Sequence, residues 1–234
     1  MIKLKDIITE GVYDPGIFKA VFTAGGPGSG KSYTASTLFG MPEKMPYVSA
    51  KGLKGVNSDS AFETYLDKAG LSQDIKSLNA DEYAKAMELR NQAKRVTVKR
   101  MHSYINGKLG MLIDGTGKNY DKIANMKKQL QLHGYDCYMI FVNTTLEVAI
   151  ERNDKRPRKV PLDILKKSWK DVQNNLGRFQ TLFGASQILI VDNSTYKEFS
   201  SVVKKAASSF VNKPIKNHIA KKWIKKELEL KKKI

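Results

Sequence analysis

Short apolar runs alternate along the chain with longer segments in which apolar residues recur every three or four positions. Residues 17–24, IFKAVFTA, are rich in β-branched and aromatic side chains and run directly into glycines, as a buried strand before a tight loop does. Similar runs predict strands at 111–113, 137–142 and 188–191, with a short one before Asp59. The helical periodicity predicts helices at 32–38, 62–69, 80–105, 121–133, 146–153, 162–182 and 196–210. This alternation predicts an α/β fold in three layers, with a mainly parallel central sheet between helices.

The two ends of the chain differ from this body. Residues 1–11 form a short amphipathic segment closed by Gly11. Residues 213–234 hold nine Lys and two Glu, so this tail carries +7 of the net charge of +18. Apolar residues such as Trp223 recur within it, which predicts a basic C-terminal helix.

The composition narrows the class of protein. With 234 residues and 41% hydrophobic content, the chain is long enough for one α/β domain with a short appendage. The net charge favours a polyanionic partner or an anionic substrate, and nucleic acid, nucleotides and anionic membranes all qualify. Cys137 stands alone in an apolar run, which excludes a disulfide framework. Because no apolar stretch approaches the roughly 18 residues of a membrane span, we expect a soluble, cytoplasmic protein.

A phosphate-binding motif follows the first predicted strand. Residues 25–32, GGPGSGKS, match G-x-x-x-x-G-K-[ST] between a strand and a helix, which is the context that the motif requires. The glycines let backbone N–H groups turn inward around a phosphate, and the following helix directs its positive dipole end at the anion. Lys31 is expected to bridge the β- and γ-phosphates of ATP or GTP, and Ser32 to place its hydroxyl on Mg²⁺. The predicted nucleotide contacts are Gly26, Gly28, Ser29, Gly30, Lys31, Ser32, Tyr33 and Arg156.

Two acids lie where strands are predicted to end. Asp114 follows the run 111–113 and precedes a small-residue turn, which places it at the carboxyl edge of the sheet, where ligands of open α/β folds bind. It is a candidate metal-side acid or a contact to substrate hydroxyls, and a helix N-cap is the alternative. Asp59 precedes a predicted helix, so it is a candidate base for the acceptor hydroxyl or an ordinary cap.

A cluster of cations follows the strand at 137–142. Arg152 lies near a predicted helix end, and Arg156 and Arg158 lie on a proline-bounded loop. Such a loop suits a lid that closes over a triphosphate and excludes water. A solvated basic loop is the alternative.

Over residues 17–193 the sequence resembles the zeta-toxin group of P-loop kinases, best at 112–142 and 150–161. The resemblance implies transfer of a phosphoryl group to a hydroxyl, with Asp59 as the catalytic acid of the family, Asp114 as the acid of its E/D-G-T-G turn, and Arg152 and Arg158 as its catalytic arginines. Together with the distinct composition of the two ends, we expect three parts: a leader-like segment at 1–11, a P-loop kinase-like domain at 12–212 and the basic tail at 213–234.

One departure from the family concerns the acceptor. Where the toxins carry an acid facing the sugar, residues 94–100 read KRVTVKR. A basic acceptor side favours an anionic substrate, so a nucleotide or a nucleic-acid end competes with the sugar nucleotide of the toxins.

Other interpretations remain open. Ile8-Thr9-Glu10 before Gly11 resembles the cleavage signal of T-even-like bacteriophage head proteases, which implies a phage protein in the host cytoplasm or the phage head; an ordinary surface helix is the alternative. The chain could also be a nucleic-acid-binding P-loop NTPase, or a packaged internal protein with a decayed site. For the tail, nucleic acid competes with a membrane surface.

Overall fold

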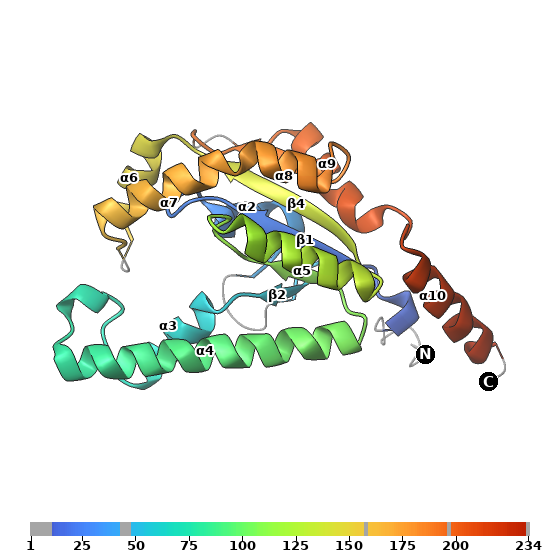
Figure 1. The fold of residues 1–234 in the computed structure, drawn as a ribbon, viewed down its shortest axis with the longest axis horizontal. Helices are drawn as coiled ribbons and strands as arrows, with labels where there is room; N and C mark the ends of the chain where they lie inside the picture. Colours follow the sequence, from blue (N-terminus) through green and yellow to red (C-terminus); the bar gives the residue numbers. More distant parts are fainter. Residues whose placement is uncertain (1–10, 43–47, 157–158, 196–197, 233–234) are drawn as a thin grey trace, which may run out of the picture.

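A computed structural model describes residues 11–42, 48–156, 159–195 and 198–232, and its centre is one parallel sheet (Figure 1). The strands are β1 Lys19–Ala24, β2 Lys54–Val56, β3 Met111–Ile113, β4 Asp136–Asn143 and β5 Ile188–Asp192. They lie in the order β2-β3-β1-β4-β5, and each neighbouring pair is parallel. The predicted α/β class is confirmed, and the order places β1 at the centre.

Helices connect the strands and follow the last strand, and several of them cover the two faces of the sheet. They are α2 Lys31–Phe39, α3 Asp59–Lys68, α4 Ala80–Asn106, α5 Tyr120–Leu132, α6 Leu146–Asp154, α7 Leu162–Asn174, α8 Leu176–Phe183, α9 Ser201–Asn212 and α10 His218–Lys231, with 3-10 turns η1 Gly11–Tyr13 and η2 Ile75–Ser77. One face packs Ile123 of α5 and Phe179 of α8 into a core cluster. The other face packs Phe39 of α2 and Phe210 of α9. This is the predicted three-layer sandwich.

The structure corrects three predicted boundaries. The helix expected at 162–182 is two helices that meet at Asn175. The Asn175 side chain donates to Gly117 O at 3.0 Å and Lys118 O at 3.1 Å, and these bonds accompany the break. The helix expected from 196 begins at Ser201, where the Ser200 hydroxyl caps Val203 N. The first strand begins at Lys19 instead of 17, since Phe18 has a φ of 53°.

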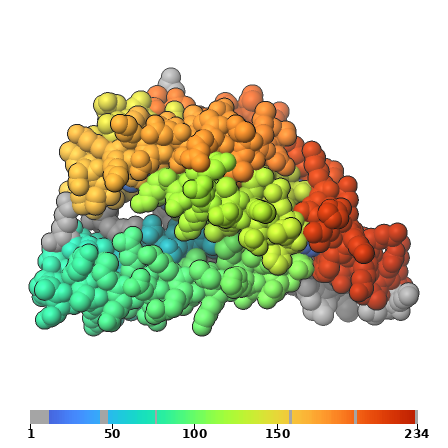
Figure 2. Space-filling view, viewed as in Figure 1, coloured from blue at the N-terminus to red at the C-terminus, as the bar shows by residue number. Residues whose placement is uncertain are grey.

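Helices α3 and α4 form an arm that extends from the β2 edge of the sheet (Figure 1). A capping box between Asn79 and Glu82 starts α4, and Phe62, Leu66, Ala86 and Ala93 bury the contact between the two helices. The surface is hollowed between this arm and helices α6 and α7 (Figure 2). The carboxyl ends of the strands open toward this hollow, so ligands of the sheet edge would lie there.

The basic C-terminal helix exists and packs against the opposite end of the sheet. The Asp136 carboxylate, at the start of β4, accepts hydrogen bonds from Lys216 N at 2.8 Å and Asn217 N at 3.0 Å. Ala220 is buried, and the Trp223 ring meets Phe18 edge-on at 5.5 Å. The domain boundaries at 11 and 212 stay predictions.

Two further expectations concern the N-terminal segment and membrane spans. Residues 1–10 of the leader-like segment lie outside the described residues. In the described part of the chain, no helix combines the length and the apolar content that a bilayer span needs.

Candidate active site

The phosphate loop joins the central strand β1 to helix α2. Gly28 and Gly30 have φ values of 79° and 84°, the region that glycine adopts without strain. A Cβ on Gly28 would come within 2.2 Å of Ala149 O, and one on Gly30 within 2.2 Å of Asn193 Nδ2. The loop is therefore packed too closely for side chains at these two positions, which leaves its backbone as the surface that a phosphate would meet.

Two residues that no sequence motif marks support this loop. Asn193, directly after β5, donates from Nδ2 to Ser29 O at 2.8 Å, and both groups are buried. Trp169 of α7 lies 3.4 Å from the position of a Cβ on Gly26 and donates from Nε1 to Thr144 O at 2.9 Å. No local motif marks either residue, because each reaches the loop from a distant element.

Lys31 stands where the loop meets α2, and the other predicted charged residues of the site affect its pKa. Its Nζ donates to Gly25 O at 2.8 Å and Gly26 O at 3.3 Å. Burial lowers the pKa of Lys31; the Asp114 carboxylate opposes this shift, Arg156 adds to it and Asp59 opposes it. Four charged residues from four separate segments thus share one electrostatic environment at the carboxyl edge of the sheet.

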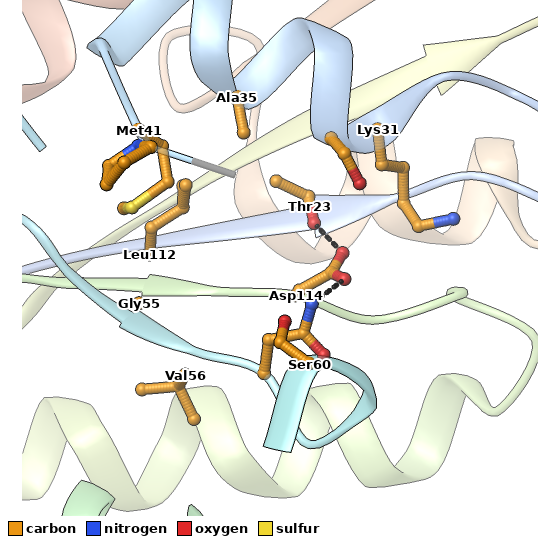
Figure 3. A pocket seen from close by; sticks show the side chains of 12 residues that line it. Thr23, Lys31, Ala35, Met41, Gly55, Val56, Ser60, Leu112 and Asp114 are labelled. Carbon is orange, nitrogen blue, oxygen red and sulfur yellow. Dashed lines mark hydrogen bonds between the residues drawn. The ribbon is translucent and has the colours of Figure 1, made fainter. Parts of the chain in front are cut away.

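Asp114 is held in a fixed orientation at the end of β3. Its Oδ1 accepts a hydrogen bond from Thr23 Oγ1 at 2.8 Å, and its Oδ2 accepts one from Asn57 Nδ2 at 3.1 Å (Figure 3). The cap of the next helix, α5, is Asn119. Asp114 is therefore not a helix cap.

Asp59 is the first residue of α3, and the capping position belongs to Ser58. The backbone N–H of Asp59 donates to Asn57 Oδ1 at 2.7 Å, so Asn57 contacts both predicted acids. A carboxylate in the first turn is favoured by the helix dipole, and Asp59 is exposed toward solvent. These facts assign the capping position to Ser58 and place Asp59 at the surface of the protein.

A pocket lies beside the phosphate loop on the β2 side (Figure 3). Its polar lining includes Lys31, Ser32 and Asp114. Asn57 and Ser60, which no sequence motif singles out, also line it. Its apolar lining is Ala35, Met41, Val56 and Leu112. The pocket thus joins predicted donor-side groups to an apolar wall that a second substrate could contact.

Of the remaining predicted site residues, Arg152 lies beside the loop. Arg152, in the last turn of α6, places Nη1 3.6 Å from the position of a Cβ on Gly30. Arg156 is exposed and acts on the pKa of Lys31, whereas Arg158 lies outside the described residues. Tyr33 is exposed, with its ring 5.6 Å from that of Phe199. The roles assigned to these residues stay predictions.

The donor atoms of the site suit Mg²⁺ and a triphosphate. Ser32 and the fixed carboxylate of Asp114 offer hard oxygen ligands in one pocket. Among the described residues, no group of three His, Cys, Asp or Glu side chains could hold a metal. Mg²⁺ fits such a site, since it commonly takes one or two protein ligands and completes its shell with phosphate and water.

A parallel sheet in the order β2-β3-β1-β4-β5, with a phosphate loop after β1, is a P-loop fold of the kinase type. The sequence model of the zeta toxin family matches residues 14–205. The chain belongs to this family.

Solved structures share the fold at low sequence identity. One is a candidate kinase from Chloroflexus aurantiacus, 15% identical with a TM-score of 0.53, covering 81% of this chain and 97% of the other. Another comes from the PezAT chromosomal toxin-antitoxin system of Streptococcus pneumoniae, 15% identical with a TM-score of 0.51, covering 83% and 86%. No curated protein sequence matches this chain.

Proposed function

We propose that the protein is a kinase that transfers the γ-phosphate of ATP or GTP to a hydroxyl of an anionic acceptor. The observation that supports this most is that Lys31 and Asp114 line one pocket, and that the charges of Asp114, Arg156 and Asp59 all act on Lys31. Phosphoryl transfer needs a phosphate cradle, an acid near the metal, a base and a cation that neutralises developing charge, and these residues supply one of each. Membership of the zeta toxin family agrees with this reaction.

On the donor side, the loop amides and the amino end of α2 bind the phosphates. Lys31 exchanges its carbonyl partners for phosphate oxygens, and Arg152 and Arg156 neutralise charge that develops on the transferred group. Tyr33 contacts the nucleotide from the first turn of α2. Ser32 and Asp114 would hold Mg²⁺, which would supply further charge neutralisation at the phosphates.

On the acceptor side, Asp59 takes the proton of the acceptor hydroxyl. The hydroxyl oxygen then bonds to the γ-phosphorus while the bond from that phosphorus to the bridging oxygen breaks, and the nucleoside diphosphate leaves with the electron pair. Lys94, Arg95 and Lys99 are exposed on α4, the helix of the arm that borders the hollow. Their charge favours a nucleotide, a nucleic-acid end or a sugar nucleotide as the acceptor.

A label-transfer experiment tests this proposal. ATP or GTP labelled in the γ-phosphate is incubated with Mg²⁺ and a panel of nucleotides, oligonucleotides with free hydroxyl ends, sugar nucleotides and neutral sugars. We expect label on an anionic acceptor. Release of inorganic phosphate alone with every member of the panel would instead indicate an NTPase.

Asp59→Asn tests the base. We expect kcat to fall on the order of 100-fold or more, with the KM for ATP nearly unchanged, because a general base contributes about 10²–10⁴-fold. Asp67→Asn is the matched control, since Asp67 is an exposed acid on the same helix. Equal activity of the Asp59 variant and the wild type would remove Asp59 from the mechanism.

A further inference from the structure

Helix α10 is fixed to the body of the protein by one side. Asp136 binds the backbone just before the helix, and Asn217 Nδ2 donates to Gln131 O at 2.8 Å. Ala220 is buried, and Trp223 and Ile224 pack against the core cluster that includes Phe18. The helix therefore presents a defined outer side to solvent.

The outer side of α10 is strongly basic. Lys221, Lys222, Lys225 and Lys226 are exposed and form two adjacent pairs on successive turns, about 5 Å apart along the axis. Lys225 has a contact of 4.0 Å to Glu229 that is exposed to solvent, where such pairs contribute little. Residues 213–232 hold eight Lys and two Glu. This density of charge on one ordered helix is complementary to a polyanion.

The contacts of α10 distinguish a double helix from a membrane surface and from a single strand as its binding partner. A helix that binds a membrane surface buries a broad apolar face in the lipid, but here Ala220 and Trp223 pack against the protein, and Ile219 and Leu230, which are exposed, are too few to form such a face. Proteins that hold single strands stack bases on exposed aromatic rings, whereas the Trp223 ring packs edge-on against Phe18. A double helix needs neither feature, because lysines bind its phosphates directly.

We propose that the exposed lysines of α10 bind the phosphate backbone of double-helical nucleic acid, independently of sequence. This surface lies at the amino-terminal end of β1 and β4, whereas the phosphate loop lies at the carboxyl end. The eight residues of β4 separate the two ends by roughly 25 Å. Nucleic acid on α10 therefore leaves the nucleotide site accessible.

The test uses a fluorescent DNA duplex of about 20 base pairs and a salt titration. Its variant is Lys221→Gln/Lys222→Gln/Lys225→Gln/Lys226→Gln. The control is Lys122→Gln/Lys128→Gln/Lys166→Gln/Lys167→Gln, which removes the same charge from exposed positions on α5 and α7. Thermal unfolding and phosphoryl transfer from ATP verify that both variants fold.

We expect the α10 variant to lose more than about tenfold in affinity at about 0.1 M salt and to reduce the salt slope by about 3, while the control changes affinity by less than about threefold. Excess MgATP should not displace the duplex. Equal losses in both variants, tighter binding of a single strand of the same length, or binding to phosphatidylserine vesicles without binding to DNA would each overturn the proposal.

Discussion

At the scale of residues, the phosphate loop keeps its shape through contacts from distant parts of the sequence. Asn193 holds Ser29 O, Ala149 O lies against Gly28, and Arg152 reaches Gly30. The glycine motif supplies the conformational freedom of the loop, and these neighbours select one conformation from it. Preorganisation of this kind means that binding a triphosphate costs less ordering entropy.

Asn193→Ala tests this support. Loss of the buried hydrogen bond to Ser29 O should lower the free energy of unfolding by about 1–2 kcal/mol and raise the KM for ATP by about tenfold. Steady-state kinetics and urea unfolding measure the two effects. Asn174→Ala, at an exposed position on α7, is the control. A KM equal to that of the wild type would show that the loop needs no such support.

The motif residues of the site could be predicted from the sequence, whereas their partners could not. Lys31 and Ser32 are fixed by the spacing of the motif, and Asp114 by its place directly after an apolar run. Asn57 and Asn193 enter the site only because separate parallel strands end at one edge. Neither residue stands in a local pattern that distinguishes it from an ordinary loop asparagine.

Cys137 gives a prediction on pH dependence. Burial raises the pKa of this thiol to about 12, whereas in an unfolded chain it ionises near about 8.5. The folded state thus keeps a proton that the unfolded state loses, so the stabilisation is complete below about pH 8.5 and falls as the pH rises toward 12.

Urea unfolding of the wild type and Cys137→Ala measures this effect, since other groups cancel in the comparison. Between pH 7.5 and pH 10 the wild type should lose about 1–2 kcal/mol more than the variant. Parallel pH profiles would mean that the thiol is not buried in the folded protein.

At the scale of elements, the arginine loop between α6 and α7 is closed at its base by one side chain. Asn153 donates from Nδ2 to Val160 O and accepts from Val160 N through Oδ1, both at 2.9 Å. Asn153 is buried, and Arg156 N donates back to Asn153 O at 3.2 Å. These bonds hold residues 153, 156 and 160 together at the base of the loop that carries Arg156.

Asn153→Asp keeps one acceptor and removes the donor of this pair. We expect kcat/KM for ATP to fall about tenfold, while the KM for the acceptor substrate stays nearly unchanged, because in the proposed mechanism the loop serves the donor side. Asp154→Asn, at the neighbouring exposed residue, is the control. Equal kinetics of Asn153→Asp and wild type would contradict a role of the clamp in positioning Arg156.

Element boundaries were predictable only where local chemistry sets them. The capping residues and glycines around α4 and α2 lie in the sequence, and these helices were placed within two residues of their bounds. The break between α7 and α8 depends on carbonyls of the turn after β3, which Asn175 meets only in the folded chain. Helical periodicity continues across this break, so the sequence pattern alone predicts one helix.

At the scale of the whole molecule, the C-terminal helix is part of the packed structure. The sequence pattern predicted a basic helix but gave no sign of where it docks, because its partners Phe18 and Asp136 lie far away in the chain. Lys19 and Asp136 form a buried ion pair at 3.4 Å, and Lys19 Nζ also donates to Lys213 O at 2.7 Å. Charge and apolar contacts thus both attach the helix.

Trp223→Ala should lower the free energy of unfolding by about 2 kcal/mol, less than for a fully buried tryptophan, because its ring is partly exposed. Chemical denaturation measures this change, and Trp223→Phe should restore most of the loss. Nucleotide affinity of the folded variant should stay unchanged, since α10 lies at the opposite end of the strands. A variant as stable as the wild type would show that α10 does not depend on this contact.

The central claim is that the loop between β1 and α2 binds a nucleoside triphosphate. Isothermal titration calorimetry with MgATP and MgGTP, on the wild type and on Lys31→Ala, tests it most directly. We predict saturable binding of one nucleotide per chain to the wild type and a loss of affinity of at least about tenfold in the variant, with equal thermal stability. No heat of binding from either nucleotide to the wild type, or equal affinity of the two proteins, would contradict the claim.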